Sequence, residues 1–199
     1  MRWPRLKWLA QSITVPGLTS KTLPVNFSGF PTQNPTGAAG TQLLPDSQMD
    51  RFTVRLSVGY PKPKDELDMV LARQGGVNPL TTVRQVVTTT ELAAMQDAVS
   101  QIYMKENLIS YVVSLISATR QHPQISRGAS PRATLAVVSM AKATAYMNQR
   151  DYVLPEDVQT VFNGTVAHRI LLATEAQSLG LTENAVLTEV MGRVAPPKV

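Results

Sequence analysis

Three polar side chains of this sequence have the chemistry to handle phosphate groups. Asn34 carries a carboxamide, which can touch a phosphate oxygen while it orients a water molecule. Arg51 carries a guanidinium, which stays charged and can bind two phosphate oxygens at once. Arg132 follows Ser130-Pro131 at the expected start of a helix, where a cation is unfavourable unless an anion stands in front of it. That conflict at Arg132 is itself a hint of phosphate binding.

Each of these residues also has a simpler structural interpretation. Asn34 can cap a turn before the proline that follows it. Arg51 can form a surface ion pair with Asp46 or Asp50, an interaction typically worth less than about 1 kcal/mol. Arg132 can be an exposed first-turn arginine without a ligand. The residue types alone leave both possibilities open.

The elements that must position Asn34 and Arg51 are strands with one short helix between them. Residues 13–15, 25–30 and 53–58 are β-type pieces, and a few helical residues after Leu44-Pro45 end on Arg51. The Pro-Lys-Pro-Lys stretch at 61–64 is a stiff connector, because each proline fixes φ and removes a backbone donor. A break in composition therefore falls near residue 60.

Beyond this connector the pattern becomes helical. Acids in the first turn, capping residues and apolar residues at helical spacing predict helices over residues 65–74, from the Thr88–Glu91 capping box to about Val99, over 107–120, over 131–148, from Pro155 onward, and over 182–190. The apolar face of the 107–120 helix comprises Leu108, Tyr111, Val112, Leu115 and Ile116. The second part is thus predicted to be an all-α bundle of five or six helices.

Composition excludes several classes of protein. The chain has 199 residues and 43% hydrophobic content, which can bury a substantial core. It contains no cysteine and only two histidines, so disulfides, thiolate chemistry and histidine-based metal sites are not expected. No apolar run approaches the roughly eighteen residues of a membrane helix, and we expect a cytoplasmic protein. A net charge of +5 would suit a polyanionic partner.

Two ordered sets of motifs resemble one known family. The first set is Thr32-Gln33-Asn34-Pro35, Gly40-Thr41, Leu44-Pro45-Asp46-Ser47-Gln48-Met49-Asp50-Arg51-Phe52 and Gly59-Tyr60-Pro61. The second is Arg120 to His122, Gly128 to Ala133, Arg150 to Val153, Pro155 to Val158 and His168-Arg169. Together they are similar to the second half of the nucleotide-binding core and the helical lid of MoxR-type AAA+ ATPases, over residues 12–195.

This resemblance implies an architecture and a role for each of the three residues. The fold class is α/β plus all-α: a partial αβα core at 1–60, a connector with a short helix at 61–87, and a helical lid at 88–199. Asn34 is the implied sensor 1, Arg51 the arginine finger that reaches the neighbouring subunit, and Arg132 sensor 2. The implied cofactors of the complete protein are ATP and Mg²⁺. The implied assembly is a homo-oligomeric ring, expected to be a hexamer, that remodels client protein complexes.

The phosphate cradle of the family is missing from the sequence. No Gly-Lys dipeptide occurs in the chain, although a P-loop ends in Gly-Lys-Ser/Thr. The only Asp-Glu pair, Asp65-Glu66, follows Pro-Lys-Pro-Lys rather than the apolar strand that a Mg²⁺-binding acidic pair requires. We therefore expect the chain to be the C-terminal part of a longer ATPase, with residues 1–11 outside the resemblance. By itself it should neither bind ATP tightly nor hydrolyse it.

Two other functions remain open from the residues. A basic helical bundle could bind nucleic acid, with Arg132 or the arginines near the end of the chain on phosphates, although no aromatic stacking platform supports this. A pure interaction module could dock on a complete ATPase or on a client. We expect His168 to be a hydrogen-bonded packing residue, and Asp50, Asp151 and Asp157 to be cap or interface charges.

Overall fold

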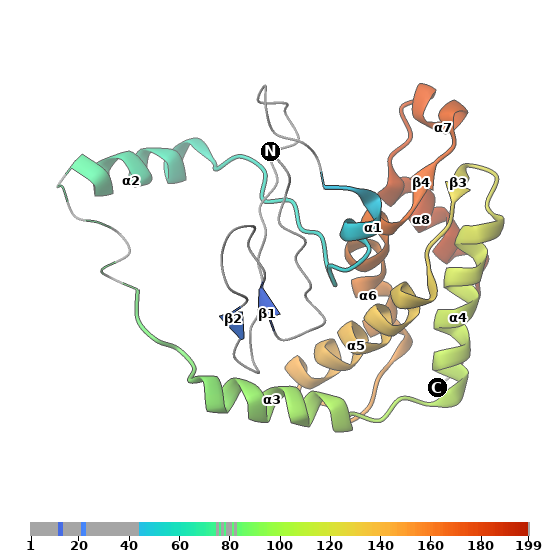
Figure 1. Ribbon diagram of the computed structural model, residues 1–199, viewed down its shortest axis with the longest axis horizontal. Helices are drawn as coiled ribbons and strands as arrows, with labels where there is room; N and C mark the ends of the chain where they lie inside the picture. The colour runs from blue at the N-terminus through green and yellow to red at the C-terminus, as the bar shows by residue number, and fades with distance from the viewer. Residues whose placement is uncertain are drawn as a thin grey trace.

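The structure is a computed structural model, and it describes residues 44–74, 76, 78, 81 and 83–198, together with the backbone of residues 12–13 and 21–22. Asn34 and the predicted strand at 25–30 lie outside the described residues. The helices are α1 (Asp46–Met49), α2 (Pro63–Gln74), α3 (Thr89–Gln101), α4 (Glu106–Gln121), α5 (Pro131–Met147), α6 (Pro155–Val166), the 3-10 turn η2 (Ala167–Arg169), α7 (Thr174–Ser178) and α8 (Glu183–Arg193). Figure 1 shows their arrangement.

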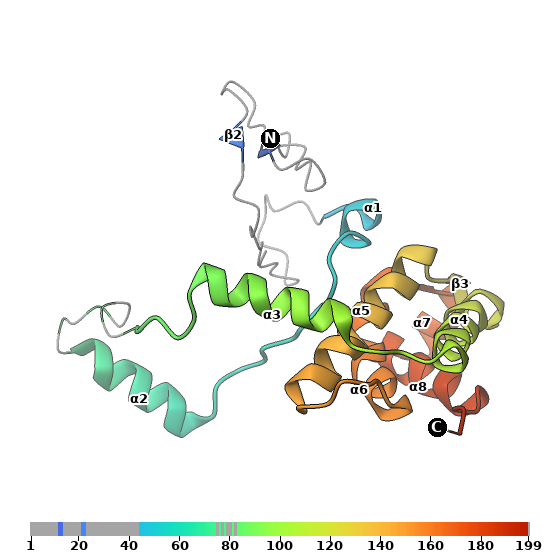
Figure 2. The same cartoon turned by 90° about the horizontal axis from the view of Figure 1, so that it is seen from below.

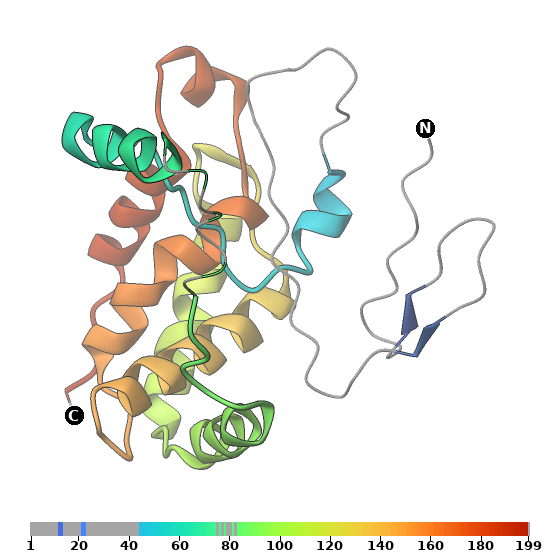
Figure 3. The ribbon, with the colours of Figure 1, turned by 90° about the vertical axis from the view of Figure 1, so that its left-hand side faces the viewer.

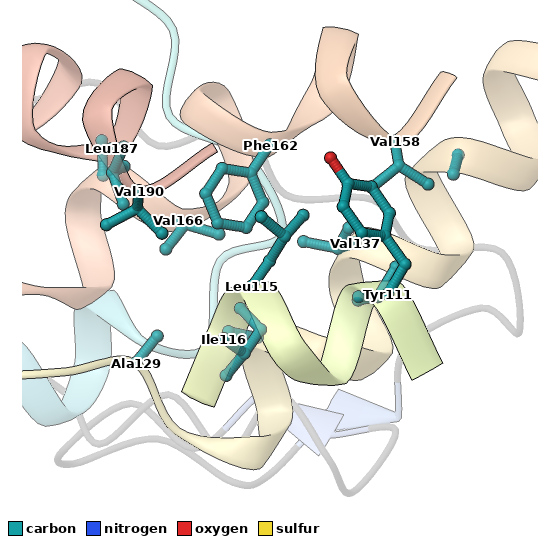
Figure 4. Close-up of a cluster of buried hydrophobic side chains, with 14 of the residues drawn as sticks. Tyr111, Leu115, Ile116, Ala129, Val137, Val158, Phe162, Val166, Leu187 and Val190 are labelled. Carbon is teal, nitrogen blue, oxygen red and sulfur yellow. The ribbon is translucent and has the colours of Figure 1, made fainter. Parts of the chain in front are cut away.

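Helices α4, α5, α6 and α8 pack around one apolar core and form the predicted bundle. Leu115 and Ile116 of α4 face Phe162 of α6 and Leu187 of α8, and all four are at most 1% exposed (Figure 4). Burying a side chain of this size stabilises the fold by about 1.5–3 kcal/mol. The apolar face predicted for residues 107–120 is confirmed, because each of its five members is buried.

The residues that begin the helices act largely as predicted. Thr88 and Glu91 form a reciprocal capping box before α3, and the Thr182 hydroxyl accepts a hydrogen bond from the Ala185 N–H before α8. Prolines occupy the first position of α5 and α6, where the missing N–H costs nothing. Helix α3, seen nearly end-on as the green coil at the bottom of Figure 3, contacts α5, and Lys142 Nζ donates to the Ser100 carbonyl at 3.0 Å.

Short antiparallel strand pairs complete the described chain. Strand β3 (Ile125–Arg127) pairs with β4 (Leu171–Leu172), a pairing that the sequence did not predict. Strand β1 (Ser12–Ile13) pairs with β2 (Lys21–Thr22) and overlaps the predicted strand 13–15 at Ile13. The β3–β4 pair joins the end of α4 to the segment after α6, and it therefore brings the loop before α5 close to η2.

The predicted strand at residues 53–58 is wrong. The segment is extended but belongs to no ladder in the described chain, and the Arg55 N–H instead donates to the carbonyl of Gly164 in α6 at 2.9 Å. Leu56 and Val58 are exposed. β-branched residues favour strands only when a neighbouring strand supplies hydrogen bonds and a packing surface, and this segment has a helix beside it instead.

Helix α2 forms as predicted, beginning two residues earlier at Pro63, but it has no buried residue. Leu67, Val70 and Leu71 are 57%, 47% and 53% exposed. Figures 1 and 2 both show α2 standing apart from the lid helices. The helix is therefore not part of the bundle in this chain.

Candidate functional site

Two of the three predicted site residues are described, and they lie on neighbouring parts of the molecule. Arg51 is in the turn that follows α1, and Arg132 is in the first turn of α5. The two segments meet because α1 packs against η2 and the beginning of α5. Residues 80 or more positions apart in the sequence thus form one cluster.

The loop before α5 is fixed by the end of α4. Arg120 Nε donates to the Ala129 carbonyl at 2.9 Å, and the Ala129 N–H donates to the Thr119 hydroxyl at 3.1 Å. Gly128 passes so close to α4 that a Cβ atom there would lie 2.6 Å from the Arg120 Cα. These contacts determine where Ser130 and Arg132 point.

An anion does stand in front of Arg132, and it is the carboxylate of Asp50. Arg132 Nη1 lies 3.1 Å from Asp50 Oδ2, and the Ser130 hydroxyl donates to the same carboxylate at 3.0 and 3.2 Å. Arg169 Nη1 approaches Asp50 Oδ1 at 3.6 Å. Ser130 occupies the predicted N-cap position, but its hydroxyl caps no helix N–H, because it is used on Asp50. Asp50 is thus an interface charge, as expected.

The carbonyl of Phe52 provides the second anchor of this turn. Arg169 Nη2 donates to it at 2.7 Å, and His168 Nε2 lies 2.8 Å from it. That separation places the proton of the neutral ring on Nε2, so His168 is the hydrogen-bonded packing residue that we expected. Its Nδ1 is buried without a partner. Burial lowers the pKa of His168 below its ordinary value of 6.5, the bond to Phe52 opposes this shift, and the charges of Arg169 and Arg55 add to it.

Arg169 is the buried cation of the cluster. Its side chain is 1% exposed, and its buried Nη1 atom has no hydrogen-bond partner in the described part of the chain. Burial lowers the pKa of this guanidinium, Asp50 counteracts the shift, and Arg132 adds to it. A buried cation is tolerable only with a compensating anion. Asp50, 3.6 Å from the Arg169 Nη1 atom, supplies negative charge that compensates this buried cation.

The side chain of Arg51 is exposed, and its guanidinium makes no hydrogen bond or ion pair with any described residue. The predicted alternative of an ion pair with Asp46 or Asp50 is wrong. Asp46 instead pairs with Arg127 at 2.8 Å, and Asp50 is used by the lid. Asp46 and Asp50 thus both have other partners, and the Arg51 guanidinium has none among the described residues.

Sequence reasoning missed the partnership of Asp50 with Ser130 and Arg169. Both Asp50 and Arg169 lie in the quoted motifs, but nothing in the spacing indicates that they meet. The cluster presents cationic and hydroxyl donors, so it suits an anion. Within the described part of the chain, no group of three His, Asp or Glu residues could hold a metal ion, and no helix is long and apolar enough to cross a membrane.

Comparisons with known proteins agree with this architecture. Residues 117–190 match the AAA lid domain family. The chain is 37% identical over 186 residues to the uncharacterized protein YeaC of Bacillus subtilis, covering 94% of this chain and 58% of that protein. It is 33% identical over 186 residues to the chaperone MoxR1 of Mycobacterium tuberculosis, covering 89% of this chain and 48% of that protein.

A crystal structure from Cytophaga hutchinsonii that carries the name of an ATPase superposes with a TM-score of 0.83 at 31% identity, covering 94% of this chain and 59% of that one. The fold class predicted from the sequence is thereby confirmed. The chain spans about half the length of the curated relatives it matches, 58% and 48% of the two described above.

Proposed function

The chain belongs to the MoxR-type AAA+ ATPases and covers their C-terminal part, and we propose that it supplies the phosphate-sensing and trans-acting residues of an ATP-hydrolysing ring. Arg132, with Asn34, contacts the γ-phosphate bound by its own subunit. Arg51 contacts the nucleotide of the next subunit. Hydrolysis in the complete assembly, which we expect to be a hexamer, drives remodelling of client protein complexes.

One observation supports this proposal above the others. Arg132 faces an anion at the start of α5, while the Arg51 guanidinium, next to that same anion in sequence, is exposed and has no described partner. An arginine that acts on a neighbouring subunit must be unpaired within its own chain, since a strong internal ion pair would have to be broken first. Among the described residues Arg51 has no such partner, which supports the proposal.

The described residues fit the phosphate part of the implied nucleotide and do not fit its metal. Arg132 and Ser130 can donate to phosphate oxygens, and the buried Nη1 of Arg169 lacks a hydrogen-bond partner. ATP supplies the phosphoryl group that is transferred to water. Arg132 would bind the negatively charged γ-phosphate of its own subunit. Arg51 would stabilise the negative charge that develops in the transition state at the site of the next subunit. No described group of acids is suited to Mg²⁺.

The isolated chain should be inactive, because the sequence contains no Gly-Lys dipeptide and hence no P-loop. Mixing it with a separately produced P-loop half of a relative should restore ATP hydrolysis. Arg51→Ala should then lower the turnover by about a thousandfold, and Arg51→Lys should recover little of it. Arg55→Ala is the matched control, because Arg55 is also exposed and its ion pair with Glu183, the one it makes with a described residue, is 3.9 Å long.

The result of this mixing experiment decides the proposal. If restored hydrolysis is equally fast with Arg51→Ala and Arg55→Ala, the trans-acting role is wrong. Magnesium-dependent hydrolysis by the isolated chain would contradict its predicted inactivity. The nucleic-acid alternative would require binding that weakens steeply as salt rises.

A further inference from the structure

Asp50 and Phe52, the two residues that flank Arg51, are both attached to the lid. The Asp50 carboxylate accepts from Ser130 and pairs with Arg132, and the Phe52 carbonyl accepts from Arg169. The direction in which Arg51 leaves the chain is therefore set by the lid and not by α1, a helix of four residues with no buried side chain. Loss of these contacts would leave Arg51 on a free turn.

The groups that hold Asp50 are the same groups that suit a phosphate. Arg132 Nη1 lies 3.1 Å from the carboxylate, the Ser130 hydroxyl 3.0 Å, and Arg169 Nη1 3.6 Å without a hydrogen bond. The pair is open to solvent, since the Arg132 side chain is 49% exposed and that of Asp50 24%. Phosphate carries more charge than a carboxylate and offers three acceptor oxygens. It can therefore compete with Asp50 for Arg132.

We infer that Asp50 is a positioning residue for Arg51 and that its carboxylate competes with phosphate for Arg132. The Arg132–Asp50 contact is one of the attachments of the Arg51 turn to the lid. When phosphate takes Arg132, the turn keeps its contacts with Ser130 and Arg169 but loses this one, and Arg51 is held less tightly. This inference rests on the proposed phosphate contact of Arg132. Through Asp50, phosphate bound at the nucleotide site of one subunit would change how firmly Arg51 is positioned toward the nucleotide site of the next subunit.

The isolated 199-residue chain tests the competition, with inorganic pyrophosphate as the probe. The side-chain Nε–Hε NMR signal of Arg132 reports binding, and trypsin cleavage after Arg51 reports release of the turn. Asp50→Asn should tighten pyrophosphate binding about fivefold, because the exposed pair contributes up to about 1 kcal/mol. Asp46→Asn removes the same charge at the other end of α1, but the partner of Asp46 is Arg127, and the substitution should tighten binding less than about twofold.

Pyrophosphate should accelerate cleavage after Arg51 in the unsubstituted chain. In Asp50→Asn, cleavage should be faster than in the unsubstituted chain from the start and insensitive to pyrophosphate, although the Phe52 carbonyl remains bound. Asp50→Glu should restore both the slower cleavage and the weaker pyrophosphate binding. A free arginyl peptide in the same digest reports any effect of pyrophosphate on trypsin. Circular dichroism checks that each variant keeps the lid helices.

Three outcomes would overturn the inference. Equal tightening by Asp50→Asn and Asp46→Asn would mean that only net charge matters. Failure of Asp50→Asn to bind pyrophosphate at up to about 10 mM would mean that the donors form no phosphate site. Unchanged cleavage of the saturated, unsubstituted chain would mean that Arg132 does not hold the turn. None of these measurements uses ATP hydrolysis, so failure here leaves the Arg51 test of the proposed function standing, and the reverse also holds.

Discussion

Replacing Asp157 should destabilise the lid more than any other single change of an acidic residue described above. Its side chain is 4% exposed and holds Arg150 through two hydrogen bonds of 2.8 and 2.6 Å. It also accepts the Leu154 N–H at 2.8 Å, at the start of α6. The hydrogen bond to Asp157 raises the pKa of Arg150 above its ordinary value. Since α6 leads directly into His168 and Arg169, its N-terminal turn supports the candidate site.

The size of the effect follows from these contacts. Losing the Leu154 hydrogen bond should cost about 1 kcal/mol, as for a helix cap. Breaking a fully buried ion pair costs about 3–5 kcal/mol. The Arg150 side chain is 21% exposed, so hydration of its unpaired guanidinium offsets part of this cost. We therefore expect Asp157→Ala to lower the free energy of unfolding by about 3 kcal/mol. Asp157→Asn keeps an oxygen for Leu154 and should lose about half as much.

Urea unfolding followed by circular dichroism measures this difference. The midpoint should shift at an unchanged slope, which identifies a change of stability rather than of the unfolded state. Asp151→Asn is the control, because Asp151 is exposed and six residues away in the same motif; it should change stability by less than about 0.5 kcal/mol. If Asp157→Asn costs no more than this control, the ion pair does not stabilise the lid.

Two further predictions concern the support of the site. Because burial lowers the folded-state pKa of His168, the unfolded chain takes up its proton first as the pH falls; the stabilisation is complete above about pH 6.5 and is lost as the pH drops through the lower folded value. His168→Gln, measured by urea unfolding from pH 7.5 to 5.5, should flatten this dependence, and an unchanged slope would contradict it. Gly128→Ala should displace the loop before α5, because its Cβ would meet Arg120 backbone atoms at 2.6 and 2.7 Å; the amide NMR signals of Ser130 and Arg132 should shift, whereas with Gly192→Ala, where a Cβ meets nothing within 4 Å, they should not.

The local part of the fold was predictable from the sequence because its causes are local. The Thr88–Glu91 capping box and the proline that opens α6 act within one helical turn, and both occur as predicted. The apolar face of α4 follows from helical spacing alone. These features need no knowledge of the rest of the chain.

The contacts that build the candidate site were not predictable in this way. Asp50 meets Ser130 and Arg169 across 80 and 119 sequence positions, and a cap-like serine before a proline carries no sign that its hydroxyl will be used elsewhere. The segment at 53–58 has strand-forming residues but packs beside α6. The strand preference of these side chains does not indicate whether the segment lies beside another strand or beside a helix.

Small buried side chains line α5, the helix whose first turn carries Arg132. Ala133, Ala141 and Ala145 are fully buried, and α5 packs more extensively against α6 than any other described pair of elements does. Small side chains let two helix axes approach to the short end of the usual 8–10 Å range. Arg132 is at the start of α5, and Arg169 follows the end of α6. The packing of α5 on α6 therefore supports both ends of the anion site, and a larger residue at the fully buried Ala141 should disturb that support.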